Sequence, residues 1–95
     1  MERKTILNSI EARLRKEGIK KAYLFGSFAR GEKKYRDIDI AIEAPKNGFS
    51  LLDLVGVEQD LEKKLHKKID LMTLRSISPY VLPYIKKDLV LLYES

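Results

Sequence analysis

Two long segments of the chain carry apolar residues at the spacing of an amphipathic helix. The first covers residues 3–17 and ends before Gly18, a residue type that commonly follows the last turn of a helix. The second covers residues 50–67, where Ser50 and Asp53 have the spacing of an N-terminal capping pair and Gly56 interrupts the middle. The apolar positions expected to face the core are Ile6 or Leu7, Ile10 and Leu14 in the first helix, and Leu51, Leu54 or Val55, Leu61 and Leu65 in the second.

Four shorter segments have the composition and alternation of strands, at residues 19–25, 37–44, 68–73 and 88–94. The clearest alternation is in residues 37–44, which place two sets of side chains on opposite faces. One set is Ile38, Ile40, Ile42 and Ala44, and the other is Asp37, Asp39, Ala41 and Glu43.

The remaining segments are turns and one short helix. Residues 44–48 form a turn-rich loop, and Ser78 with Pro79 predicts a short helix to Lys87 that Pro83 kinks or splits. The order is therefore helix, strand, a turn with a short helix, strand, helix, strand, helix, strand. We expect an α/β (α+β) fold with one small mixed sheet and helices packed on it, forming a single domain over residues 1–95.

Composition excludes several kinds of protein. The 95 residues include no cysteine and one histidine, His66, so disulfides, thiolate metal sites and histidine clusters are excluded. No apolar run has the length of a membrane span, and the N-terminus lacks the apolar segment of a signal peptide. We therefore expect a cytoplasmic protein with no membrane partner.

The charge balance favours anionic partners. The 19 Lys and Arg exceed the 14 Asp and Glu by five, which suits nucleotides or nucleic acid without choosing between them. The three Phe and five Tyr are dispersed rather than interleaved with basic residues, and no recognition helix is evident. We keep nucleic-acid binding as a third hypothesis and expect no direct nucleic-acid contact.

Three aspartates on two predicted strands are the candidate chemical groups. Asp37 and Asp39 share one face of their strand, roughly 6.5–7 Å apart between Cα atoms. Asp70 lies at the centre of another strand, opposite the apolar face made by its neighbours. If the two strands are adjacent, the carboxylates can converge on Mg²⁺, a hard cation that prefers oxygen ligands. The alternatives are a solvated face for the first two residues and an ion pair with Lys68 or Arg75 for Asp70.

A Gly-Ser pair lies where the strand at residues 19–25 ends. Gly26 allows a sharp turn and a close approach to a ligand, and the turn can direct backbone N–H groups and the Ser27 hydroxyl at phosphate oxygens. Arg30 follows three residues later and can face the same anion if a helical turn follows. The alternative is an ordinary turn with a surface arginine.

Together these motifs resemble a known family. The pattern G-S-x9-D-x-D, the segment "GSFARG", the later Asp70 on a strand and the ending "SPYVLPYI…VLLYES" are similar to the minimal nucleotidyltransferases of the DNA polymerase beta-like superfamily. The resemblance covers nearly the whole chain. Two departures stand out: many minimal members have ten residues between the serine and the first aspartate, and a serine where this chain has Arg36. The shorter loop leaves the role of Arg30 open.

The resemblance implies a fold, a reaction and a partner. Asp37, Asp39 and Asp70 would be the catalytic residues and the ligands of two Mg²⁺ ions, and Gly26, Ser27 and Arg30 would bind the nucleotide phosphates. The reaction would transfer AMP from ATP to a hydroxyl of a protein. Minimal members are often the antitoxin of a type VII-like pair whose partner is a small helical HEPN-type protein, which would act in trans. The alternative is a non-catalytic nucleotide-binding antitoxin that neutralises its partner by contact.

Overall fold

A single mixed sheet of four strands forms the centre of the molecule. The computed structural model describes residues 2–45 and 47–95, so Met1 and the Lys46 position of the predicted 44–48 loop lie outside the described residues. The strands are β1 (Lys21–Phe25), β2 (Asp37–Glu43), β3 (Lys68–Thr73) and β4 (Val90–Glu94), in the spatial order β3-β2-β1-β4. β1 is antiparallel to both β2 and β4, and β2 is parallel to β3. The predicted mixed sheet is confirmed.

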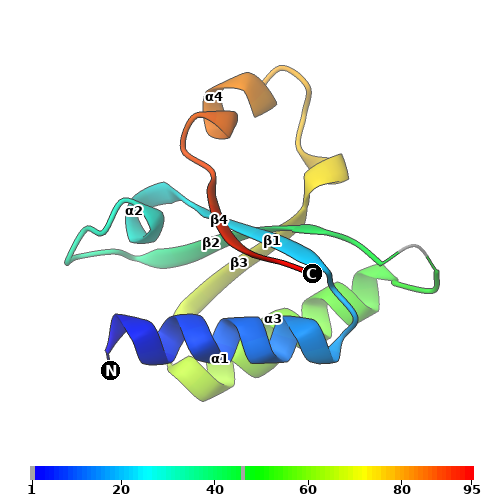
Figure 1. Cartoon of the computed structure of the whole chain (residues 1–95), viewed down its shortest axis with the longest axis horizontal. Helices are drawn as coiled ribbons and strands as arrows, with labels where there is room; N and C mark the ends of the chain where they lie inside the picture. Colours follow the sequence, from blue (N-terminus) through cyan, green and yellow to red (C-terminus); the bar gives the residue numbers. More distant parts are fainter. Residues whose placement is uncertain (1, 46) are drawn as a thin grey trace.

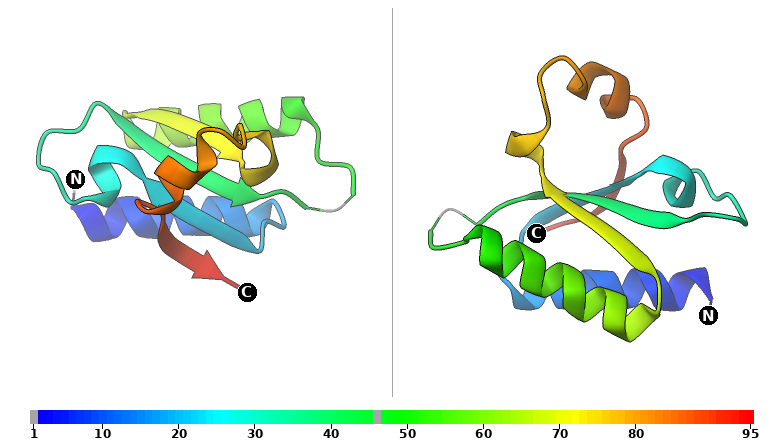
Figure 2. Two further views of the ribbon diagram at one scale, coloured as in Figure 1. Left: turned by 90° about the horizontal axis from the view of Figure 1, so that it is seen from above. Right: turned by 180° about the vertical axis from the view of Figure 1, so that it is seen from behind.

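The helices divide between the two faces of this sheet. Figure 1 shows α1 (Arg3–Lys16) and α3 (Leu51–Leu65) side by side beneath one face, while α4 (Leu82–Lys86) stands over the other. The views of Figure 2 show the same division from above and from behind. The four-residue α2 (Gly26–Ala29) follows β1 at one end of the sheet, and a 3₁₀ turn (Leu74–Ser76) follows β3. The face under α4 is therefore the more open one.

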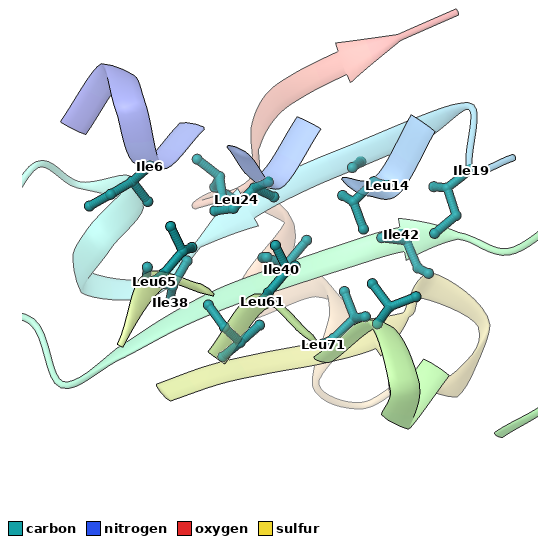
Figure 3. Close-up of a cluster of buried hydrophobic side chains, with 14 of the residues drawn as sticks. Ile6, Leu14, Ile19, Leu24, Ile38, Ile40, Ile42, Leu61, Leu65 and Leu71 are labelled. Atoms are coloured by element: carbon teal, nitrogen blue, oxygen red, sulfur yellow. The ribbon is translucent and has the colours of Figure 1, made fainter. Parts of the chain in front are cut away.

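The hydrophobic core lies between the sheet and the pair of long helices. Ile6, Ile10 and Leu14 of α1 are buried, in agreement with the predicted helical periodicity. Figure 3 shows Ile6 and Leu14 facing the side chains of the sheet. The sheet and α3 contribute buried residues that include Leu24, Ile38, Ile40, Ile42, Val57, Leu61, Leu65, Ile69 and Leu71.

The start of α3 differs in part from the prediction. Ser50 and Asp53 form the expected capping box, in which the Ser50 hydroxyl accepts a hydrogen bond from the Asp53 N–H at 3.2 Å. Leu51, however, was expected in the core and is 73% exposed, whereas Val57 is buried. Leu51 lines an open surface hollow with Leu54 and Met72, so it has the correct periodicity but does not enter the core.

The last helix begins later than predicted. Residues 78–81 form a turn in which the N–H of Val81 and of Leu82 both donate to the Ser78 carbonyl, at 2.9 and 2.8 Å. The helix then runs from Leu82 to Lys86 with Pro83 in its first turn. Pro83 therefore neither kinks nor splits the helix, because a proline in the first turn has no intrahelical N–H bond to lose.

Across residues 2–45 and 47–95, no helix has the length and apolarity needed to cross a membrane.

Candidate active site

Asp39 and Asp70 lie side by side on neighbouring strands. In the parallel pairing of β2 with β3, Asp39 is the direct partner of Asp70, and Asp37 is the partner of Lys68. Paired residues of adjacent strands are about 4.8 Å apart and point to the same face. The two strands are therefore adjacent, which was the condition for the carboxylates to converge, and the three carboxylates share the face opposite α1 and α3.

The electrostatics of Asp39 reflect this crowding. Asp39 is half-buried, and its pKa is raised, first because burial disfavours the carboxylate and then because Asp70 and Asp37 lie nearby. Asp37 is also half-buried and Asp70 is exposed. No ion pair joins any of the three to a lysine or arginine of the described residues, so the alternative of an Asp70 pair with Lys68 or Arg75 does not hold. This group of carboxylates has no internal neutralising charge.

Gly26 is pressed against the carboxylate of Asp39. Its φ of 76° lies in the left-handed region, which side chains with a Cβ disfavour. A Cβ at this position would collide with the Asp39 Oδ2 and would lie 3.3 Å from the Asp39 Cγ. The end of β1 can therefore turn into α2 directly beside Asp39 only because residue 26 is glycine.

Ser27 lies in the first turn of α2, next to this close approach. The Ser27 carbonyl accepts the N–H of Glu32 at 3.2 Å, which ties the loop after α2 back to its start. Its hydroxyl makes no hydrogen bond to any of the residues that the structure describes. The first N–H groups of a helix have no partner within the helix, so this turn offers donors beside the aspartates.

Arg30 has a different environment from the one expected. Its guanidinium is exposed and pairs with Glu32 at 2.8 Å, and the pKa of Arg30 is raised mainly by this hydrogen bond. The negative charge of Asp88, which lies between α4 and β4, contributes weakly in the same direction. The side chain is thus held by Glu32 rather than turned onto Ser27.

The donor chemistry of the three aspartates fits Mg²⁺, although the ligands are not already gathered around one point. Over the part of the chain that the structure describes, no three His, Cys, Asp or Glu side chains are close enough to enclose an ion. Carboxylate oxygens are the ligands that hard divalent cations prefer, and no positive charge of the described residues is paired with the three aspartates. A cation would supply that charge as the side chains turn toward it.

Two acidic residues that the sequence reasoning missed hold the strand carrying Asp70. The backbone N–H of Ile69 donates to the Glu62 Oε2 at 3.0 Å, and that of Leu71 donates to the Glu58 Oε2 at 2.9 Å. These are the residues on either side of Asp70, on the outer edge of the sheet. Their spacing of four on α3 was the available signal, since it places both carboxylates on one side of the helix.

An apolar hollow also lies on the face of the sheet that carries the aspartates. Tyr23 of β1 and residues around α4 enclose a volume of about 400 Å³. The other residues that line it are Leu74, Leu82, Lys86 and Leu89. These positions are scattered over more than sixty residues of sequence, and nothing in their spacing predicts that they meet.

Comparison with known proteins identifies the family. The model of the family described as "Polymerase beta, Nucleotidyltransferase" matches residues 8–95. The chain belongs to this nucleotidyltransferase family. The match includes Gly26, Ser27 and all three aspartates, so the motif that carried the resemblance falls inside it.

Relatives from Methanocaldococcus jannaschii are named as candidate protein adenylyltransferases. MJ0435 is 49% identical over 67 residues, which cover 70% of this chain and 71% of the relative. MJ0126 is 40% identical over 92 residues, which cover 94% of this chain and 93% of the relative. The chain is thus an enzyme of the nucleotidyltransferase family, as the sequence predicted.

Solved structures give the same fold. A toxin–antitoxin protein solved with AMP-PNP aligns with a TM-score of 0.79 and 28% identity, over 94% of this chain and 73% of that one. A complex of MNT antitoxin with tri-AMPylated HEPN toxin from Shewanella oneidensis aligns with a TM-score of 0.78 and 26% identity, over 99% and 74%. The chain is therefore similar in structure to MNT antitoxins.

Proposed function

We propose that this nucleotidyltransferase transfers AMP from ATP to a hydroxyl group of a protein, in a Mg²⁺-dependent reaction. The observation that carries the proposal is the set of three unneutralised carboxylates, Asp37, Asp39 and Asp70, beside the Gly26–Ser27 turn. A site of this kind acts by positioning and charge stabilisation rather than by forming a covalent enzyme intermediate. ATP is abundant in the cytoplasm, where we expect the reaction to take place.

Each residue of the site has a role that its position supports. Gly26 and Ser27 seat the triphosphate through backbone N–H groups and the Ser27 hydroxyl. Asp70, the most exposed of the three carboxylates, accepts the proton of the attacking hydroxyl. The hydroxyl oxygen bonds to the α-phosphorus, the bond from that phosphorus to the β-phosphate oxygen breaks, and pyrophosphate leaves.

Asp37, Asp39 and Asp70 would hold two Mg²⁺ ions, which when bound supply the positive charge that phosphoryl and nucleotidyl transfer require. Arg30 is paired with Glu32. Its contact with phosphate would require exchange of the Glu32 carboxylate for a phosphate oxygen.

The proposed acceptor is a small helical HEPN-type protein, and the chain would be its antitoxin. The Shewanella oneidensis complex supports this proposal, because its HEPN toxin is tri-AMPylated and bound to an MNT antitoxin. Exposed apolar side chains also lie on α4, on the turn before it and on β4, among them Tyr84, Tyr80 and Leu91. Exposed apolar surface of this kind suits a protein partner.

The test is labelling of the co-expressed partner from ATP labelled in the α-phosphate. Asp37→Asn and Asp39→Asn should each abolish labelling, and chelation of Mg²⁺ should do the same. The matched control is Asp60→Asn, because Asp60 is an exposed α3 aspartate paired with Arg13, away from the site. Labelling that persists in both site variants contradicts the proposal.

The second candidate function, neutralisation by contact alone, is distinguished by the same variants. If Asp39→Asn still protects cells from the partner although labelling is lost, contact rather than chemistry provides the protection. If protection is lost together with labelling, AMP transfer provides it.

A further inference from the structure

A second hollow, in which basic residues form the largest group of charged side chains, lies beside the start of α1. It encloses about 550 Å³ between the start of α1 and the loop that joins α2 to β2. Four of its lining residues are cationic, Arg3, Lys33, Lys34 and Lys67, and they come from three separate segments of the chain. Figures 1 and 2 both show the start of α1 beside α2 and this loop. We refer to it as the basic hollow.

The positive charge of the basic hollow is not neutralised by the protein. Over residues 2–45 and 47–95, none of the four cations has a carboxylate within the 4.0 Å of an ion pair. The one acidic residue that lines the hollow, Glu32, pairs with Arg30 at 2.8 Å. Four like charges around one depression repel one another, and an anion bound among them would relieve that repulsion.

Two of the cations are held in place by aromatic rings and a backbone group. The Arg3 Nη1 donates to the Phe28 carbonyl at 2.7 Å, and the guanidinium lies 4.2 Å from the centroid of the Phe28 ring. The Lys67 Nζ lies 5.2 Å from the centroid of the Tyr35 ring. Cations fixed in this way lose less conformational entropy when they bind a ligand than unrestrained surface side chains do.

We propose that the basic hollow binds a compact anion with two or more linked phosphate groups, at a site distinct from the catalytic one. The cations surround a single depression rather than follow a groove, which suits a short phosphate chain better than a nucleic-acid strand. The Tyr35 ring also offers no open platform for a stacked base, because Lys67 lies over it and the Phe28 ring meets it edge-on with centroids 4.8 Å apart. The source of the phosphates is either free pyrophosphate or the diphosphate of a nucleotide.

The basic hollow and the proposed catalytic site share one segment of the chain. Lys33, Lys34 and Tyr35 belong to the segment that joins Ser27 to Asp37. Pyrophosphate is also the leaving group of the proposed reaction, but the binding proposed here depends only on the basic hollow. It is therefore measured without Mg²⁺ and without an acceptor protein.

The experiment is isothermal titration calorimetry of the intact chain with pyrophosphate and with ADP, in the presence of EDTA. The variant is Lys33→Ala with Lys34→Ala, two exposed side chains whose loss should leave the fold intact. The matched control is Lys63→Ala with Lys64→Ala, which removes the same charge from α3 outside the hollow. Ser27→Ala tests whether the ligand occupies the proposed catalytic phosphate seat instead.

The expected result is binding that weakens about tenfold or more in the Lys33/Lys34 variant and remains within about twofold in the other two. Equal affinity for both ligands identifies free polyphosphate as the ligand, and tighter binding of ADP identifies the nucleotide. Equal weakening in both lysine variants, weakening by Ser27→Ala alone, or binding of single-stranded RNA without binding of either diphosphate would overturn the proposal.

Discussion

The substitution Gly26→Ala tests the close packing that builds the catalytic site. The added Cβ has two separate costs, because residue 26 has a φ of 76° and because Asp39 occupies the space that the Cβ needs. A left-handed backbone costs an ordinary residue about 1–2 kcal/mol, and forcing extra volume into packed structure costs about 1–3 kcal/mol. The expected loss in the free energy of unfolding is therefore about 2–5 kcal/mol.

The chain contains a matched control for the backbone cost alone. Gly31 has a φ of 78°, and a Cβ built there meets no atom within 4 Å. Gly31→Ala should therefore lose only about 1–2 kcal/mol. The difference between the two variants isolates the collision with Asp39.

A double-mutant cycle then assigns that difference to one side chain. In an Asp39→Ala background the colliding carboxylate is gone, so Gly26→Ala should cost no more than Gly31→Ala does in the wild type. Urea unfolding followed by circular dichroism, with unchanged m-values, measures all of these free energies. Equal losses for Gly26→Ala and Gly31→Ala, or a Gly26→Ala loss that Asp39→Ala does not reduce, would refute the packing argument.

Three further predictions concern charge and hydrogen bonding around the site and the sheet. Asp39→Asn should raise the free energy of unfolding by about 0.5–2 kcal/mol while abolishing transfer, because it removes a desolvated charge from beside two other carboxylates. Thermal and urea unfolding measure this change, and a loss of stability would contradict the prediction. Glu58→Ala and Glu62→Ala should each lower the free energy of unfolding by about 1–2 kcal/mol and speed hydrogen exchange of the β3 amide that donates to that carboxylate. Unchanged exchange would show that water replaces the carboxylate without loss. The Tyr93 hydroxyl donates to the Ile19 carbonyl, and burial raises the pKa of Tyr93 to about 12. The free energy of unfolding of the wild type should therefore fall as pH rises from about 10, where the tyrosine of the unfolded chain ionises, to about 12, and Tyr93→Phe should remove that pH dependence.

Elements whose pattern is local were predictable from the sequence. The alternation in β2 identified the isoleucines that enter the core, and Ser50 with Asp53 identified the start of α3. Both depend on contacts within a few residues of sequence. The three aspartates could be proposed as a group for the same reason, since each lies opposite an apolar face of its own strand.

The exposure of residues near the ends of elements, and the exact residue at which an element begins, were not predictable in the same way. Leu51 has the periodicity of a core residue, but at the start of α3 it lines an open surface hollow and is not covered. The helix predicted from Ser78 starts at Leu82, because the Ser78 carbonyl closes a turn first. Periodicity gives the face of an element and does not give the length of the surface that it packs on.

Polar residues with tertiary roles were the hardest to predict. Glu58 and Glu62 have the pattern of a solvated helix face, yet they accept hydrogen bonds from the edge strand that carries Asp70. The adjacency of Asp39 and Asp70 was conditional on strand order, which the sequence leaves open. A charged side chain can form its hydrogen bonds with water or with a protein partner, so composition alone does not show which of the two it contacts.

The most direct test of the account compares ATP labelled in the α-phosphate with ATP labelled in the γ-phosphate, each incubated with the protein, Mg²⁺ and its co-purified helical partner. The arrangement of Asp37, Asp39 and Asp70 beside the Gly26–Ser27 turn predicts that only the α-label becomes attached to the partner and that the γ-label is released in pyrophosphate. Attachment of the γ-label, or attachment of neither label, would contradict it.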